Sequence, residues 1–184
     1  MLALLGAPAH AQVAPIEAGP ATASASFGLR RTSLRSQGAW MLGGDALISF
    51  GGSFSLGGGG WTLAEPIRMP GAAGAFDLDL AMSYAGVQAE YVLTAAGAPS
   101  LALRLLVGAG SATLSLPVVG TETAADNFGV LEPEAVALLP MWGFMELRAQ
   151  LGYRFAYGVE DLPQVAPEHL RGVTASLAIS LGPF

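Results

Sequence analysis

The sequence predicts an all-β fold, an eight-stranded antiparallel up-and-down transmembrane β-barrel, on three observations. Charged residues make up 12% of the chain and hydrophobic residues 52%, whereas an average soluble domain has roughly 25% charged residues. No segment offers the ~18 uncharged apolar residues that a membrane-spanning helix needs. Hydrophobic residues instead alternate with polar ones along many short stretches, which is the period of a β-strand.

Turn signals and this alternation divide the chain into eight predicted strands. Their residue ranges are 26–34, 39–50, 53–63, 78–94, 100–115, 128–139, 142–158 and 170–182. Short connections at 51–52, 95–99 and 140–141 alternate with long links at 64–77, 116–127 and 159–169, and only the first hairpin, at 35–38, lacks a long link where one is expected. Short turns at one end and long loops at the other are typical of outer-membrane barrels, and an even strand number places both termini on the periplasmic side.

The clearest alternation lies in residues 145–158, MELRAQLGYRFAYG, where Leu147 and Leu151 share one face and Glu146 and Arg148 the other. Residues 39–50, 100–109 and 170–182 alternate similarly. Residues 78–94 change parity near their middle, so we expect a bulge near 84–86, or exposure of their first half above the membrane. The glycine run 57–60 leaves the facing of residues 53–63 open, because it is compatible with a bulge, a bend or a close approach.

Ionisable side chains lie on the polar faces of these strands. Facing lipid they would be very costly, and an eight-stranded barrel encloses packed side chains rather than an open channel. We therefore predict a structural lumen charge network whose acids and bases fill the barrel and satisfy each other, with glycine making room for the Arg side chains. The alternative is a proton or ion path. The predicted members are Asp45, Glu90, Arg104, Glu132, Glu134, Glu146, Arg148 and Arg154.

Aromatic residues gather near the predicted strand ends, as in the two interfacial belts of membrane proteins. One group lies by the short turns: Phe50, Phe54, Tyr91, Trp142 and Phe144. The other lies toward the long loops: Trp40, Trp61, Phe76, Tyr84, Phe128, Tyr153, Phe155 and Tyr157. The alternative is a soluble barrel with aromatic residues in its core, but the low charge content favours the membrane.

The N-terminal residues 1–11, MLALLGAPAHA, are interpreted as a truncated signal peptide. Leu2 to Leu5 form a short apolar stretch, and Ala9-His10-Ala11 fits the small-x-small cleavage rule. The basic n-region is missing, and a disordered or packed N-terminal arm is the alternative. Residues 12–25 are interpreted as a flexible lead-in of small residues and Pro, so the barrel is predicted to comprise residues 26–184.

Between residues 40 and 184 the chain contains WMLGGDALISFGGSFSLGGGGWTL, MSYAGVQAEYVL, LLVGAG, FGVLEPEAVALL, LGYRFAYGVEDLP and HLRGVTASLAISLGPF. These stretches resemble small outer-membrane β-barrel proteins of Gram-negative bacteria. The most specific pieces are Leu131-Glu132-Pro133, Gly152-Tyr153-Arg154 with Gly158, and the ending in Gly182 and Phe184. The resemblance implies a location in the cell outer membrane and no settled activity. Phe184 resembles the signal read by the barrel-assembly machinery, although its parity is opposite to that of Leu177, Ile179 and Leu181.

Motifs that carry chemistry are sparse. The chain has no cysteine, which excludes disulfides and thiolate metal sites, and we predict no metal and no cofactor. Past the predicted signal His169 is the only histidine, and Glu160, Asp161 and Glu168 share its loop, where a loose divalent-cation site and a solvated surface are the alternatives. The stretch GSFSLGGGG lacks the Gly-Lys-Ser/Thr ending of a phosphate loop. Arg30, Arg31 and Arg35 either touch lipid phosphates near a rim or are ordinary strand-end charges.

These observations predict a monomeric, non-enzymatic outer-membrane barrel with a structural, adhesive or envelope-maintenance role through its outward loops. Outer-membrane lipid and the barrel-assembly machinery are its predicted partners, whereas the net charge of −6 argues against nucleic acid. A second hypothesis is a conduit for small hydrophobic molecules that enter through the loops and leave sideways into lipid; a lumen filled by the charge network would refute it. A lipid-modifying rim enzyme that uses His169 and a soluble periplasmic barrel are the remaining alternatives.

Overall fold

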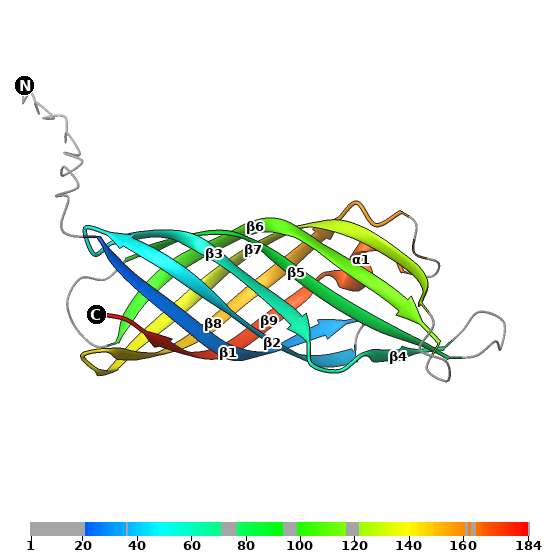
Figure 1. The fold of residues 1–184 in the computed structure, drawn as a ribbon, viewed down its shortest axis with the longest axis horizontal. Coiled ribbons are helices and arrows are strands. Elements are labelled where there is room, and N and C mark those ends of the chain that lie inside the picture. The colour runs from blue at the N-terminus through cyan, green and yellow to red at the C-terminus, as the bar shows by residue number, and fades with distance from the viewer. Residues whose placement is uncertain are drawn as a thin grey trace, which may run out of the picture.

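The computed structural model describes residues 21–35, 37–70, 77–93, 99–116, 122–160, 162 and 165–183. In this part of the chain, antiparallel strands form one closed sheet and a four-residue helix precedes the last strand (Figure 1). The elements are β1 (Thr22–Leu34), β2 (Gln37–Phe50), β3 (Phe54–Leu63), β4 (Ile67–Met69), β5 (Leu78–Val92), β6 (Ser100–Ser115), β7 (Glu122–Trp142), β8 (Met145–Tyr157), α1 (Pro167–Leu170) and β9 (Gly172–Leu181). No helix in the described ranges is long and apolar enough to cross a membrane.

The sheet closes into an eight-stranded up-and-down barrel, which confirms the predicted fold. The strand order is β3-β2-β1-β9-β8-β7-β6-β5-β4, and β3 also pairs with β5. The short β4 pairs with β5 immediately beyond the segment that pairs with β3, so β3 and β4 together form one of the eight walls. The start of β1 and the end of β9 lie at one end of the barrel, here called the terminal end, and the links β3–β5, β6–β7 and β8–β9 lie at the opposite loop end (Figure 1).

The predicted strand ranges differ from the observed strands mainly at the loop end. Strand β1 begins at Thr22, four residues before the expected start at 26. Strand β7 begins at Glu122 and so includes part of the predicted 116–127 link, because β6 extends to Ser115 and the two strands keep pairing. The other two long links contain β4 and α1. The predicted signal peptide, most of the lead-in and Phe184 lie outside the described residues.

The alternation of each strand separates an outer lipid-like face from the lumen. On β8, Leu151 is 60% exposed on the outside, while Glu146, Arg148 and Arg154 point inward and are buried. Strand β3 follows the same rule despite its glycine run, with Trp61 buried on the inner face. Gly59 lies on this inner face at a close approach, where a Cβ atom would come within 2.6 Å of the Gln88 Nε2 atom.

Of the two alternatives for residues 78–94, a bulge near 84–86 is wrong, and the remaining one is a first half that extends above the membrane. Strand β5 pairs with β3 and β6 without a register shift, and its even-numbered residues point inward along its whole length. Leu80 and Met82 are buried inside the barrel, as are Gln88 and Glu90 further down the same face. The change of parity in the sequence therefore records a change in the lumen, which is apolar toward the loops and polar toward the termini.

The predicted aromatic belts are partly wrong for the same reason. Trp61, Tyr84 and Phe128 each have 3% of their surface exposed and point into the lumen. Phe76 lies outside the described residues. Outward aromatic residues remain at both levels: Trp40, Tyr153, Phe155 and Tyr157 toward the loops, and Phe50, Tyr91, Trp142 and Phe144 toward the termini.

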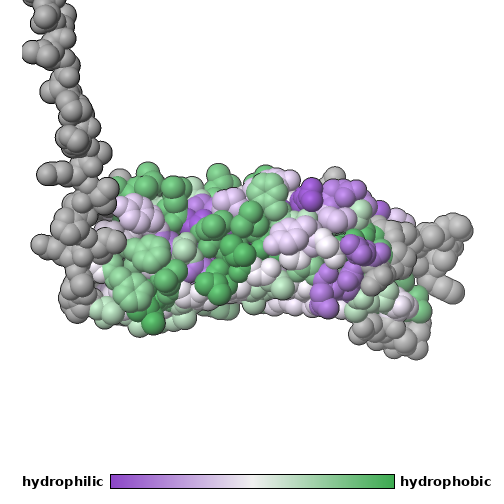
Figure 2. All heavy atoms as spheres, turned by 90° about the horizontal axis from the view of Figure 1, so that it is seen from above, coloured by the Kyte–Doolittle hydropathy of each residue, from purple (hydrophilic) through white to green (hydrophobic). Residues whose placement is uncertain are grey.

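The outer surface carries an apolar band near the terminal end and the middle of the barrel, and hydrophilic residues gather toward the loop end (Figure 2). On β2 the outward stretch from Trp40 to Phe50 covers eleven residues, close to the ~9–11 residues that a tilted strand needs to span a bilayer. Beyond this band the outward residues of β5, β6 and β7 become polar, as at Ser83, Ser111 and Asn127. The outer surface of these three strands is therefore suited to water at the loop end.

Candidate functional site

The charged side chains in the terminal half of the lumen form a closed ring of ion pairs. Arg104 on β6 donates to the Glu90 Oε2 atom at 2.7 Å and 2.9 Å and to the Asp45 Oδ2 atom at 2.8 Å. Arg148 on β8 donates to the Glu90 Oε1 atom and lies 3.7 Å from the Asp45 Oδ1 atom. It also lies 3.2 Å from a carboxylate oxygen of Glu146. Two acids from β2 and β5 are thus shared by two arginines from β6 and β8.

A second group of contacts surrounds Arg30 on β1, halfway along the lumen. Its guanidinium is 1% exposed, donates to the Glu132 Oε2 atom at 2.7 Å and pairs with Glu134. The Tyr84 hydroxyl accepts from Arg30 at 2.9 Å and donates to Glu132 at 2.9 Å. The Trp61 ring stacks on the guanidinium, with 3.9 Å from its centroid to the Arg30 Cζ atom. Arg104 and Glu134, 3.9 Å apart, connect this group to the terminal ring.

Glycines on the inner wall give these bulky groups their space. A Cβ atom at Gly43 would lie 2.6 Å from the Trp61 ring, and one at Gly152 would lie 2.8 Å from the Glu134 Cγ atom. Real Cβ atoms do not approach so closely, so a side chain at either position would displace its neighbour. We expected glycine to make room for arginines; at these two positions it makes room for their partners.

Arg154 is the predicted network member that has no carboxylate partner within the described residues. Its side chain is fully buried, donates from Nε to the Leu170 carbonyl oxygen at 2.8 Å and reaches the Met41 sulfur at 3.7 Å. Its Nη2 atom makes no hydrogen bond in the described part of the chain. The guanidinium lies 5.5 Å from the centroid of the Tyr84 ring, on the loop side of the Arg30 contacts. The structure therefore places Arg154 apart from the other seven predicted members.

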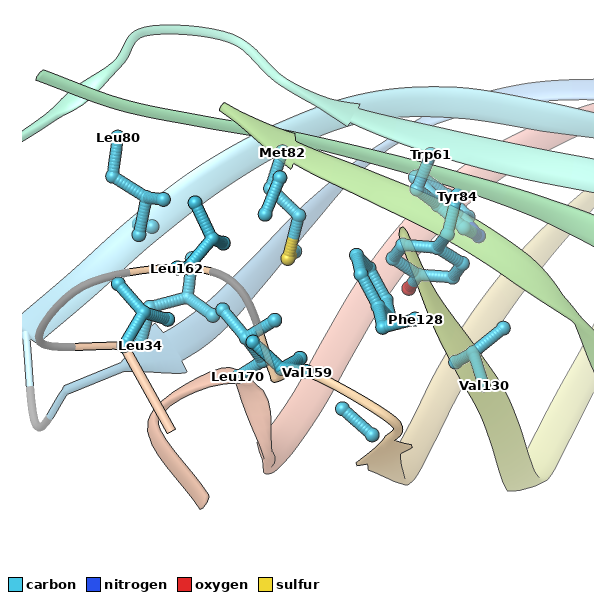
Figure 3. Close-up of a cluster of buried hydrophobic side chains, with 14 of the residues drawn as sticks. Leu34, Trp61, Leu80, Met82, Tyr84, Phe128, Val130, Val159, Leu162 and Leu170 are labelled. Atoms are coloured by element: carbon cyan, nitrogen blue, oxygen red, sulfur yellow. The ribbon is translucent and has the colours of Figure 1, made fainter. Parts of the chain in front are cut away.

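The loop end of the lumen is apolar, and the β8–β9 link covers it (Figure 3). Leu80, Met82 and Phe128 point inward from the wall. Leu162 and Leu170 reach this cluster from the β8–β9 link and are 5% and 0% exposed. Two hydrogen bonds hold the link: the Arg35 amide donates to the His169 carbonyl oxygen, and the Glu160 amide donates to the Asp126 side-chain carboxylate. This buried cluster is called the apolar mouth below. It also includes Met41, Trp61, Met69 and Leu114.

His169 has a structural role at the start of α1. Its Nδ1 atom accepts a hydrogen bond from the Ala166 amide at 3.0 Å, which caps the four-residue helix. Glu168 is exposed, and Asp161 lies outside the described residues. The described ranges contain no group of three or more residues suited to hold a metal ion. His169 therefore has no described acid or serine partner of the kind that catalysis by a rim enzyme would use.

Sequence reasoning missed the residue with the most partners in the lumen, Arg30. Together with Arg31 and Arg35 it was expected to touch lipid phosphates near a rim or to be an ordinary strand-end charge. Its parity was the available signal, since Phe27, Leu29 and Arg31 form the outward face of β1 and Arg30 lies between them. Tyr84, Gln150 and Ser176 were missed as partners because these contacts depend on the register between strands that are far apart in the sequence. No single segment predicts that register.

Comparisons with known proteins support the fold and no more. No protein-family model and no curated protein matches the chain. Among solved structures it is similar to Ail, the attachment invasion locus protein of Yersinia pestis, in complex with the heparin analogue sucrose octasulfate (14% identity, 89% of this chain and 97% of that one, TM-score 0.54). It is also similar to Neisserial surface protein A (12%, 88% and 96%, TM-score 0.64) and to the N-terminal β-barrel domain of Pseudomonas aeruginosa OprF (12%, 86% and 96%, TM-score 0.51). These neighbours are small outer-membrane barrels of Gram-negative bacteria, and the chain has their fold.

Proposed function

We propose that this protein is a monomeric outer-membrane barrel with a plugged lumen, a rigid and non-conducting support for its outward loops in a structural, adhesive or envelope-maintenance role. The outward apolar band supports the membrane location, because lipid is the solvent that such a surface suits. Outer-membrane lipid and the barrel-assembly machinery are its partners in this proposal. The observation that carries the proposal is the wall-to-wall reach of the buried arginines.

Two arginines bridge opposite parts of the wall. Arg30 extends from β1 to carboxylates on β7 and to the Tyr84 hydroxyl on β5. Arg104 extends from β6 to carboxylates on β2 and β5. An ion moving along the axis would have to break these buried pairs, each of which costs about 3–5 kcal/mol when one partner is lost. The contacts therefore favour a structural network over an ion path.

Single-channel recording in planar bilayers tests the plug. We expect the wild-type protein, folded in detergent and checked by its heat-modifiable gel mobility, to produce no conductance steps. The double variant Glu90→Ala with Arg104→Ala removes the centre of the terminal ring and serves as the comparison. Regular wild-type steps that this double variant leaves unchanged would overturn the proposal of a plugged lumen.

The adhesive role depends on the loop end and is tested separately. Ail, which shares the fold, is described as an attachment protein bound to a heparin analogue. The net charge of −6 does not favour the same polyanionic ligand here. Cells that display the barrel should attach to surfaces more than cells that display a version with the β3–β5 and β6–β7 links replaced by Gly-Ser segments. Equal attachment would leave the structural and envelope-maintenance roles and exclude adhesion.

The charge network in the lumen counts against a conduit through the barrel, and the apolar mouth supports only a narrower second candidate, entry of small hydrophobic molecules at the loop end. Three methionines, Met41, Met69 and Met82, lie in the mouth and could repack around a guest. Trp61 also lies in this cluster, so it reports on entry. In a variant with Trp40 and Trp142 replaced by Phe, a brominated alkane should quench Trp61 if the mouth admits it. Quenching no greater than in a variant of the same background with Leu170→Phe would count against entry, since the added ring fills the mouth without adding a tryptophan.

A further inference from the structure

The outward face ends differently on the two sides of the barrel. Near the loop end of four neighbouring strands, β8, β9, β1 and β2, one large aromatic or cationic side chain lies on the outer face of each strand or directly before it. These are Tyr157, Arg171, Arg31 and Trp40. On β3, β5, β6 and β7 the corresponding rows become polar at Thr62, Ser83, Ser111 and Asn127. We call the first set the arginine side and the second the hydroxyl side.

Arg31 and Arg171 are exposed, and neither has a carboxylate within 4.0 Å among the described residues. The Arg31 guanidinium lies 5.5 Å from the centroid of the Trp40 ring. Arg171 donates from Nε to the Ala156 carbonyl oxygen at 3.0 Å, which fixes its side chain against the end of β8. The remaining exposed arginine on a strand, Arg68 of β4, lies 3.9 Å from Asp79 on the hydroxyl side. The two sides therefore differ in available positive charge.

Apolar residues lie next to both arginines on the outer face, on the side toward the terminal end. Leu29 and Phe27 precede Arg31 on the outer face of β1, at 50% and 66% exposure, and Val173 follows Arg171 on β9. In the sheet register Arg31 faces Ala175, four residues along β9 from Arg171. At about 3.3 Å per residue this separates the two backbone positions by roughly 13 Å. The arrangement offers two cationic contacts above a continuous apolar surface.

We propose that the arginine side binds anionic lipid headgroups that expose a phosphate monoester, in the leaflet at the loop end, with Arg31 and Arg171 contacting the phosphates. The guanidinium fork matches the oxygens of a phosphate, and Trp40 and Tyr157 have the amphipathic character that suits the headgroup level. The apolar rows beneath hold the acyl chains, which is why a lipid fits this surface better than a free phosphate ion. The inference rests on the proposed membrane location and adds a preferred lipid and a preferred side.

Tryptophan quenching by brominated lipids tests this proposal. The background variant Trp142→Phe leaves Trp40 on the arginine side and Trp61 shielded in the lumen. The protein is folded into phosphatidylcholine vesicles that contain either brominated phosphatidic acid or brominated phosphatidylcholine at equal mole fraction. We expect stronger quenching by the phosphatidic acid, corresponding to a binding preference on the order of fivefold for each arginine near its phosphate.

Matched variants separate this surface from general attraction. The double variant Arg31→Gln with Arg171→Gln should lose the preference, whereas Arg68→Gln, on the hydroxyl side, should keep it. Equal quenching by the two lipids in the parent background, or equal loss in Arg68→Gln, would overturn the proposal. Millimolar inorganic phosphate should leave the preference unchanged; abolition would assign the site to a free anion. Insertion into vesicles is verified by heat-modifiable mobility, so a failure of the membrane location would be seen independently as a failure to insert.

Discussion

The terminal side of the barrel and its loop end place the same residue types in opposite positions. Toward the termini Leu105 and Leu177 face outward, and Glu90 and Arg104 are buried between the walls. Toward the loops Leu80 and Leu114 are fully buried, and Ser83 and Ser111 lie on the outer face. A single sheet with one unbroken alternation on β5 and β6 makes both arrangements. The content of the lumen therefore depends on what surrounds the outer face. Where the outer face is apolar the lumen is polar, and where the outer face is polar the lumen is apolar.

The two cores are stabilised by different forces. In the terminal section the gain comes from a small apolar cluster of Ala102, Val136 and Leu138 and from buried ion pairs, which must be complete because an unpartnered buried charge is costly. In the loop section it comes from removing apolar surface from water, at roughly 25 cal/mol per Å². Removal of one partner should therefore be more damaging in the terminal section, and loss of volume more damaging at the loop end.

The largest effect is expected from Arg30→Met, which leaves Glu132 without its cation and Glu134 with only the 3.9 Å contact to Arg104. The free energy of unfolding should fall by about 3–5 kcal/mol, the typical result of breaking a buried pair. Unfolding in guanidinium, followed by gel mobility in vesicles, measures the change. Arg68→Met is the control, since Arg68 is exposed and its partner is 3.9 Å away; a surface change of this kind stays within about 0.5 kcal/mol. Equal effects of the two variants would contradict a structural network.

Arginine substitutions at two outward positions of β5 should locate the boundary between the two sections. Val87 and Ser83 both point outward from β5, and Val87 is 66% exposed within the apolar band. Val87→Arg should cost about 2–4 kcal/mol, as charges near the bilayer midplane do, and Ser83→Arg about 0–1 kcal/mol, as near the interface. The measurement is the same vesicle unfolding experiment. A soluble barrel would instead tolerate both substitutions equally.

Loss of volume at the loop end should have a somewhat smaller effect. Leu114 is fully buried in the apolar mouth, and Leu114→Ala should lower the free energy of unfolding by about 2 kcal/mol, toward the lower end for such truncations because a rim site can partly collapse. Leu114→Met keeps the volume and should cost less than about 1.5 kcal/mol. If both variants behave alike, the mouth is not a packed core.

The sequence predicts which residues of a strand face outward better than it predicts the contacts inside the barrel. Alternation alone predicted that Glu146 and Arg148 would face inward and Leu151 outward, because facing is a local property of one strand. Arg30 and its partners belong to β1, β5 and β7, and their meeting depends on register between strands far apart in the chain. The parity change of residues 78–94 was left between a bulge and a first half above the membrane, because one strand by itself does not show where the membrane ends. Knowing that the barrel extends past the membrane would have assigned Leu80 and Met82 to the core.

Arg154 belongs to the terminal section by residue type and to the loop section by its surroundings. It is fully buried among Met41, Tyr84 and Leu170 and has no described carboxylate partner. Arg154→Met would remove one hydrogen bond to the Leu170 carbonyl oxygen, worth about 1 kcal/mol, and would also remove an uncompensated charge from an apolar region. These contributions oppose each other, so the free energy of unfolding should change by less than about 1 kcal/mol.

The same substitution to Met should thus have different consequences on β8 and β1, the two strands that flank β9: near neutrality at Arg154 and a severe loss at Arg30. Arg154→Lys is the useful companion, because it keeps the charge and loses the guanidinium hydrogen bond, and it should be less stable than Arg154→Met. A loss above about 3 kcal/mol in Arg154→Met would show that Arg154 is paired within the charge network. The division of the lumen would then lie further toward the loops, above the β8 position of this arginine.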